Sequence, residues 1–158
     1  DPHDERRNPE VAVDVLADIY NRFGHKLKEK ALEINELIDA LQEETGVDNA
    51  HTVIAGFSQG AMLACYTALS RSHFDGKCLM FSGVVAGAAS LAVEQRSFPK
   101  IYLFHGKDDV SVNYKTVEFS EKWLRAHGTE PVVRRYDGLA HKMRDDELQD
   151  AVSVITEK

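Results

Sequence analysis

One short segment constrains the fold more than any other: a run of apolar, mostly β-branched residues leads through a glycine-flanked serine into a helix-forming stretch. The run is Thr52-Val53-Ile54-Ala55, the turn is Gly56-Phe57-Ser58-Gln59-Gly60, and residues 61–70 are rich in Ala, Leu and Met. A continuous apolar run is typical of a strand buried on both faces of a sheet. So abrupt a turn requires small neighbours of the serine, because larger side chains would collide. The segment therefore predicts an α/β fold with a doubly covered sheet.

Strand-like and helical segments alternate through the rest of the chain. Further buried strands are predicted at Lys77–Phe81, 100–104 and Val132–Tyr136. Helices are predicted from Asn8 onward, at about 25–44, at 61–70, at about 114–127 and from 144 or 145 to 155, with residues 82–90 as a small-residue loop. Strands that alternate with helices imply parallel strands with helices on both faces of the sheet.

Length and composition favour a single globular domain over residues 1–158, with residues 1–8, which are polar, expected to be loose. A chain of this length can bury roughly 68–70% of its unfolded surface. The sequence is 43% hydrophobic and 28% charged, which excludes a disordered tail, a collagen-like rod and a disulfide scaffold. The net charge of −7 argues against nucleic acid as a partner, because an acidic surface repels a phosphate backbone.

Membrane and redox signals are weak throughout the sequence. No apolar run approaches the roughly 18 residues of a membrane span, and the chain opens without the apolar core of a signal peptide. Cys65 and Cys78 lie in apolar runs and are interpreted as small buried residues, and neither belongs to a CxxC pair or a metal-type Cys/His cluster. These features predict a cytoplasmic protein with no integral membrane segment and no bound metal.

The glycine-flanked Ser58 is the candidate nucleophile. A sharp strand-to-helix turn raises the serine oxygen above the sheet, at a helix N-terminus where free backbone N–H groups favour negative charge. The N–H of Gln59 is then the predicted oxyanion donor. The alternative is a serine that caps a helix after a glycine-rich turn. The position of the motif between a strand and a helix favours the nucleophile.

A serine nucleophile needs a base, and four histidines follow Ser58: His73, His105, His127 and His141. His73 follows the helix after the turn, and His127 lies near the end of an amphipathic helix. His105 ends a strand, where its ring is expected to pack against or hold the next loop. His141 lies between the last strand and the last helix, at the same sheet edge as Ser58. His141 is therefore the predicted base.

Three aspartates are candidates for the acid that orients this histidine. Asp108 and Asp109 follow the third strand at the sheet edge where ligands bind in open α/β folds. Asp137 lies only four residues before His141, within one loop. The residues alone leave the choice among the three open.

Four blocks of the sequence together resemble the phospholipase/carboxylesterase branch of the α/β hydrolases, which includes acyl-protein thioesterases and small bacterial carboxylesterases. The blocks are Gly56-Phe57-Ser58-Gln59-Gly60, Phe81-Ser82-Gly83, His105-Gly106-Lys107-Asp108-Asp109 and Gly138-Leu139-Ala140-His141. The resemblance implies a three-layer sandwich with a mostly parallel sheet and names Asp109 as the acid. Val112 stands where the family has proline.

The resemblance also implies strands ahead of this region, so we expect an N-terminally truncated hydrolase domain. Members of the family supply a second oxyanion donor from an H-G-x-G-type loop. No such motif precedes Ser58, and the nearest glycines are Gly24 and Gly46. Loss of one donor typically costs about 10²–10³ in rate. An uncovered strand edge would also be prone to association.

These observations predict a serine hydrolase that cleaves small esters or acyl-thioesters through an acyl-enzyme and requires no cofactor. The binding site for the acyl group would be lined by Phe57, Val84, Val85, Val110, Leu139 and Met143, although loop or core packing explains these residues equally well. One alternative is a binding module without activity on the same scaffold. Another is a peptidase or lactone hydrolase, because the same triad can cleave several classes of acyl compound. The oligomeric state stays open.

Overall fold

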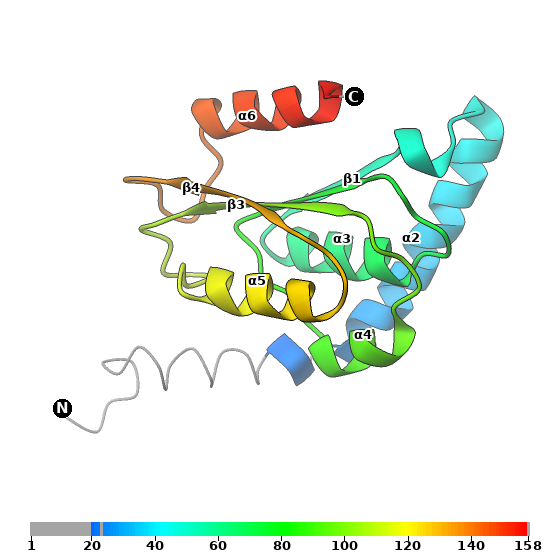
Figure 1. Ribbon diagram of the computed structural model, residues 1–158, viewed down its shortest axis with the longest axis horizontal. Helices are drawn as coiled ribbons and strands as arrows, with labels where there is room; N and C mark the ends of the chain where they lie inside the picture. Colours follow the sequence, from blue (N-terminus) through cyan, green and yellow to red (C-terminus); the bar gives the residue numbers. More distant parts are fainter. Residues whose placement is uncertain (1–19, 23, 158) are drawn as a thin grey trace.

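A four-stranded sheet with helices on both sides forms the centre of the structure, a computed structural model that describes residues 20–22 and 24–157 (Figure 1). Its elements are α2 (Gly24–Thr45), the 3₁₀ turn η2 (Asn49–His51), β1 (Val53–Phe57), α3 (Gln59–Ser70), β2 (Lys77–Phe81), α4 (Ala88–Glu94), β3 (Lys100–Gly106), α5 (Thr116–Ala126), β4 (Val132–Tyr136) and α6 (Asp145–Thr156). The predictions for residues 1–8 and for a helix from Asn8 lie outside the described residues.

The strands of the described chain are all parallel and lie in the order β1-β2-β3-β4. Helices α3 and α5 cover one face, with α2 beside α3, and α6 covers the other face (Figure 1). The predicted three-layer α/β sandwich is thus confirmed. Because the strands are parallel, the loops that follow them emerge at one edge of the sheet.

Alternate residues of the central strands serve two separate cores. Cys78 and Met80 of β2 pack with the helices of the α3 face, whereas Leu79 and Phe81 pack with Ala151 and other residues of the α6 face. This two-residue period is the ordinary geometry of a strand. Both faces are covered, which explains why β2 and β3 are continuously apolar in the sequence.

The structure corrects one segment of the sequence prediction. Residues 82–90 were expected to form a loop, but α4 begins within them at Ala88. Its Leu91 is completely buried in the α3-side core, and the Ala89 N–H donates to Asn21 Oδ1. A helix of seven residues is too short to be stable alone, so these tertiary contacts hold it in place. No local pattern in the sequence carries that information.

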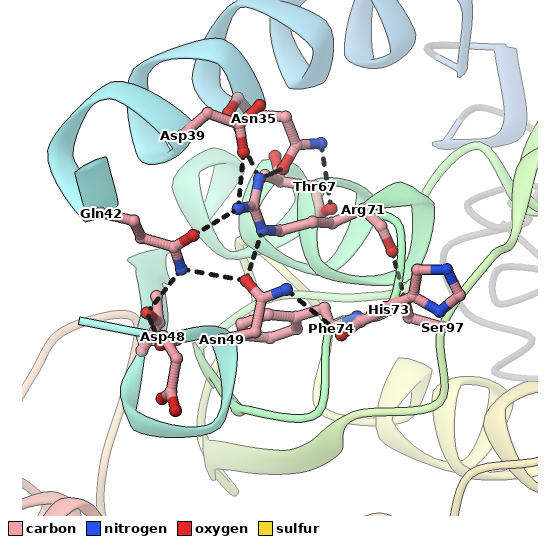
Figure 2. A network of polar contacts seen from close by, with 11 residues as sticks. Asn35, Asp39, Gln42, Asp48, Asn49, Thr67, Arg71, His73, Phe74 and Ser97 are labelled. Carbon is pink, nitrogen blue, oxygen red and sulfur yellow. Dashed lines mark hydrogen bonds and ion pairs between the residues drawn. The ribbon is translucent and has the colours of Figure 1, made fainter. Parts of the chain in front are cut away.

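A polar network joins α2 to the C-terminal end of α3 (Figure 2). Its centre is the buried guanidinium of Arg71, which donates to Asp39 Oδ1 at 2.8 Å and to Gln42 Oε1 at 2.9 Å. It also donates to Asn49 Oδ1 at 3.0 Å and to Asn35 Oδ1 at 3.2 Å. Because Asn35, Asp39 and Gln42 lie three to four residues apart on α2, the arginine holds one face of that helix.

Candidate active site

Ser58 occupies the turn between β1 and α3. Its backbone has φ 57° and ψ −118°, a left-handed conformation that costs a non-glycine residue about 1–3 kcal/mol. The Ser58 N–H donates to Phe81 O at 2.8 Å, and the Ser58 carbonyl accepts from Ala61 N at 3.0 Å. One residue therefore ends the strand pairing and begins the helix, as the sequence predicted for this turn.

The two glycines of the motif meet different surroundings. A Cβ atom on Gly56 would lie 2.1 Å from Gly60 O and 2.8 Å from Ala61 N, so strand and helix pack directly on each other there. A Cβ on Gly60 would meet nothing within 4 Å in the described chain. The expectation that both flanking residues must be small is therefore correct for Gly56 and not explained by packing for Gly60.

The structure brings Ser58, His141 and Asp109 into one chain of hydrogen bonds. His141 Nδ1 lies 2.8 Å from Asp109 Oδ2, and His141 Nε2 lies 2.9 Å from Ser58 Oγ. The three residues follow β1, β4 and β3 at the same edge of the sheet. Since a carboxylate only accepts, Nδ1 carries the proton and Nε2 is free to accept from the serine hydroxyl. This arrangement can deprotonate Ser58.

Asp109 is held rigidly in its loop. Its side chain is completely buried, and Oδ1 accepts from the N–H groups of Ser111 at 3.0 Å and Val112 at 2.9 Å. This leaves Oδ2 for the imidazole. Asp108 and Asp137 are exposed, and the Asp137 carboxylate pairs with Lys107 Nζ at 2.8 Å instead. Of the three aspartates left open by the sequence, Asp109 is the one that contacts His141.

Of the other histidines after Ser58, His73 and His127 form no hydrogen bond with Ser58, Asp109 or His141 in the described structure, whereas His105 lies next to Asp109. His127 Nδ1 is 2.8 Å from Trp123 O, and the two rings stack with centroids 3.8 Å apart. His73 has a left-handed backbone in the turn after α3. The buried His105 ring places Nε2 2.8 Å from Val112 O, so it holds the loop after β3 as expected.

The residues predicted to line an acyl group separate into two sets. The Phe57 ring lies 4.9 Å from the His141 ring, and Val110 and Met143 are exposed. The remaining three have almost no surface to offer a substrate and pack in the protein core: Val84, Val85 and Leu139. Their apolar character reflects packing beneath the loops, which the sequence could not separate from substrate contact.

A cavity of about 410 Å³ opens beside Gln59 and Gly60, where free N–H groups of the first turn of α3 lie. It is lined by Tyr20, Lys26, Leu27, Lys30, Gln59, Gly60, Met62 and Leu63. Burial raises the pKa of Tyr20, and the charge of Asp109 adds to that rise. Sequence reasoning did not predict this cavity, because Leu27 belongs to an ordinary apolar helix stripe.

Residues 20–22 and 24–157 contain no group of three or more His, Cys, Asp or Glu side chains that could hold a metal ion. None of the helices described there is long and apolar enough to cross a membrane. Cys65 and Cys78 are free and buried, and burial raises the pKa of Cys65 to about 12. Neither thiol therefore lies at the site in a reactive form.

Residues 15–157 match the family model described as Phospholipase/Carboxylesterase. The chain belongs to the phospholipase/carboxylesterase family. A probable carboxylesterase of Oryza sativa subsp. japonica is 30% identical over 125 residues, which cover 76% of this chain and 52% of the relative. Acyl-protein thioesterase 1 homolog 2 of Dictyostelium discoideum is 29% identical over 127 residues, which cover 76% of this chain and 57% of the relative. The chain thus spans about half the length of these curated relatives.

Solved structures of esterases share the fold. The crystal structure of esterase PE8 matches with a TM-score of 0.77 and 28% identity, over 82% of this chain and 60% of that one. Arabidopsis thaliana SOBER1 matches with the same TM-score and 25% identity, over 82% of this chain and 62% of that one. These matches confirm the resemblance noted in the sequence and the α/β-hydrolase-like fold.

Proposed function

We propose that this chain carries the nucleophile, base and acid of a serine hydrolase that cleaves carboxylic esters or thioesters. The observation that carries the proposal is the unbroken chain from Ser58 Oγ through His141 to Asp109, with links of 2.9 and 2.8 Å. A serine hydroxyl is a weak nucleophile unless a base removes its proton. The contact between His141 Nε2 and Ser58 Oγ supports His141 as that base.

In the first step, Ser58 Oγ attacks the acyl carbon while its proton passes to His141 Nε2. The buried Asp109 carboxylate holds Nδ1–H and stabilises the imidazolium that forms. The N–H of Gln59, in the first turn of α3, donates to the developing oxyanion. Positive charge on His141 and negative charge on the substrate oxygen thus form together beside groups that were already in place.

Collapse of the tetrahedral intermediate breaks the bond to the leaving group. His141 gives its proton to the departing alkoxide or thiolate, which leaves an acyl group esterified to Ser58. Water then loses a proton to His141 Nε2 and attacks the acyl carbon, and His141 returns the proton to Ser58 Oγ. The balance is one ester or thioester plus water giving one carboxylic acid plus one alcohol or thiol.

The substrate class follows from the relatives and from the surroundings of Ser58. Relatives carry the names carboxylesterase and acyl-protein thioesterase, and both reactions use the same acyl-transfer steps. The cavity beside Gln59 has a mostly apolar lining, with Leu27, Met62 and Leu63 among its residues. We assign this cavity to the acyl chain of a small ester or acyl-thioester.

Hydrolysis of p-nitrophenyl butyrate by the wild type and by Ser58→Ala tests the proposal. We expect Ser58→Ala to lower kcat by at least about 10³-fold. The matched control is Ser82→Ala, because Ser82 ends the neighbouring strand with a similar φ of 54° but has no hydrogen-bond partner for its buried hydroxyl in the described structure. Ser82→Ala should keep activity within a few-fold of the wild type. Equal rates for the wild type and Ser58→Ala would instead favour a binding module without activity.

A further inference from the structure

His105 is a buried titratable residue that the proposed chemistry does not use. It is the penultimate residue of β3, and 1% of its surface is exposed. Its Nε2 lies 2.8 Å from Val112 O and 3.5 Å from Asp109 Oδ2. A carbonyl oxygen only accepts, so Nε2 carries a hydrogen and the N–H end of the ring faces both oxygens.

Val112 connects this histidine to the acid of the triad. The Val112 N–H donates to Asp109 Oδ1 at 2.9 Å, and the Val112 carbonyl accepts from His105 at 2.8 Å. The same residue is therefore fixed at its amide by the carboxylate and at its carbonyl by the histidine. Removal of the His105 N–H would free the carbonyl and, through it, one of the two backbone donors that orient Asp109.

The charge state of His105 suits this role. Burial lowers the pKa of His105, and although the Val112 carbonyl and Asp109 act in the opposite direction, the net shift is downward. The groups that face it are Asp109, the nearby His141 and the ring of Tyr114 at 6.2 Å, while Tyr20 interacts with the same carboxylate. A neutral His105 turns an N–H dipole toward Asp109 without adding a second cation that would compete with His141.

We propose that His105 is a positioning residue for Asp109: its Nε2–H fixes the Val112 carbonyl and thereby keeps Asp109 Oδ2 aligned with His141. This inference rests on the proposed hydrolase function. A misplacement of about 1 Å in such a site costs about 10²-fold in rate. A looser Asp109 would also stabilise the His141 imidazolium less in the transition state.

The test compares His105→Met, which removes the N–H at similar volume, with His105→Gln, whose side-chain amide can still donate to Val112 O. For His105→Met we expect kcat for p-nitrophenyl butyrate to fall about 10- to 100-fold with little change in KM. His105→Gln should restore most of the rate, because its side-chain amide can still fix the Val112 carbonyl.

A measurement on the wild type keeps the inference testable even if His105→Met does not fold. In ¹⁵N-histidine spectra, His105 should stay in the neutral Nε2–H tautomer across the pH range in which the enzyme is active. An unchanged kcat in folded His105→Met, an equal loss in His105→Gln, or a protonated His105 in that pH range would overturn the positioning role. Failure of the proposed function looks different, because the wild type would then be no faster than Ser58→Ala.

Discussion

Two polar clusters lie at the two ends of helix α3 and differ in how completely their groups are bonded. At the C-terminal end, Arg71 donates to acceptors on α2 and η2, and its side chain is 6% exposed (Figure 2). At the N-terminal end, Ser58 has a strained backbone and His141 keeps 22% of its side chain exposed. The Arg71 guanidinium is closed to solvent, although the Asp39 carboxylate beside it is exposed, whereas the second cluster keeps an accessible imidazole.

Backbone conformation and exposure distinguish the stabilising cluster from the reactive one more clearly than the types of residue do. Both clusters contain an aspartate, and both join segments that are far apart in sequence. Arg71 is the C-cap residue of α3, and its φ of −69° is an ordinary backbone conformation. Backbone strain and an accessible imidazole are features that a protein retains at a reactive site. We therefore expect changes in the first cluster to alter stability and changes in the second to alter rate.

The largest expected effect is on the rate of Asp109→Asn. The amide can still accept from Ser111 and Val112 through Oδ1, but its NH₂ faces His141 Nδ1 and favours the wrong tautomer. We expect kcat to fall about 10⁴-fold with little change in the midpoint of thermal unfolding. Asp108→Asn, at the exposed neighbouring position, is the matched control and should stay near the wild-type rate. A large loss of kcat in Asp108→Asn would instead identify Asp108 as the acid that orients His141.

Glu147 belongs to neither cluster, and we expect it to make the stability of the protein depend on pH. It is fully buried at the start of α6, its Oε2 has no hydrogen-bond partner in the described structure, and burial raises its pKa to about 7. The folded state then holds a proton that the unfolded state releases above about pH 4.5, so the wild type loses stability as pH rises from about 4.5 through 7. The full difference corresponds to about 3 kcal/mol.

Glu147→Gln removes this titration. We expect urea unfolding to show Glu147→Gln more stable than the wild type at pH 8 by an amount approaching that figure, with a much smaller difference at pH 5. Glu36→Gln, at an exposed position of α2, should show no such pH dependence. An equal effect of Glu147→Gln at both pH values would contradict a change in the protonation of Glu147 between pH 5 and 8.

Arg71→Met tests the cluster centred on Arg71. Removal of the guanidinium leaves the half-buried Asn35 Oδ1 and Gln42 Oε1 without this donor and Asp39 without its ion pair, so we expect a loss of about 2 kcal/mol in the free energy of unfolding. At 20 °C the kcat of the folded fraction should be unchanged. Arg134→Met on the exposed face of β4 should change stability by less than about 0.5 kcal/mol. A loss of kcat in Arg71→Met without a loss of stability would contradict the claim that the Arg71 cluster affects stability and not rate.

The smallest expected effect is that of Gly60→Ala. An added Cβ meets nothing within 4 Å in the described chain, and alanine favours a helix, so the variant should gain up to about 1 kcal/mol of stability. The same change at Gly56 would bring a Cβ to 2.1 Å from Gly60 O and should destabilise the turn. Thermal unfolding of both variants measures the contrast. Equal destabilisation would show that Gly60 is packed against a group outside the described residues.

Sequence patterns anticipated the parts of this molecule that depend on local chemistry. Strands β2 and β4 begin and end where predicted: β2 is apolar from Cys78 to Phe81, and β4 begins with two valines. The turn at Ser58 was recognisable because its backbone demands a glycine at position 56. His141 could be chosen among four histidines because parallel strands bring their carboxyl ends to one edge.

The remaining features depend on contacts that no local pattern records. Asp108 and Asp109 are adjacent and chemically identical, so only the fold of their loop, or the family resemblance, separates them. Val84 and Leu139 are as apolar as substrate-lining residues, yet both are core residues. The partners of Arg71 lie 22 to 36 residues away in sequence, and helix α4 depends on tertiary packing of Leu91.

Labelling with a fluorophosphonate probe tests the central claim most directly, because such a probe reacts with a serine only when a base has activated it. We predict that the folded wild-type protein gains one probe adduct by intact mass, and that peptide mapping places it on Ser58. Ser58→Ala should gain none, and Asp109→Asn should label far more slowly than Asp108→Asn. An unlabelled, folded wild-type protein, or an adduct on another residue, would contradict the account.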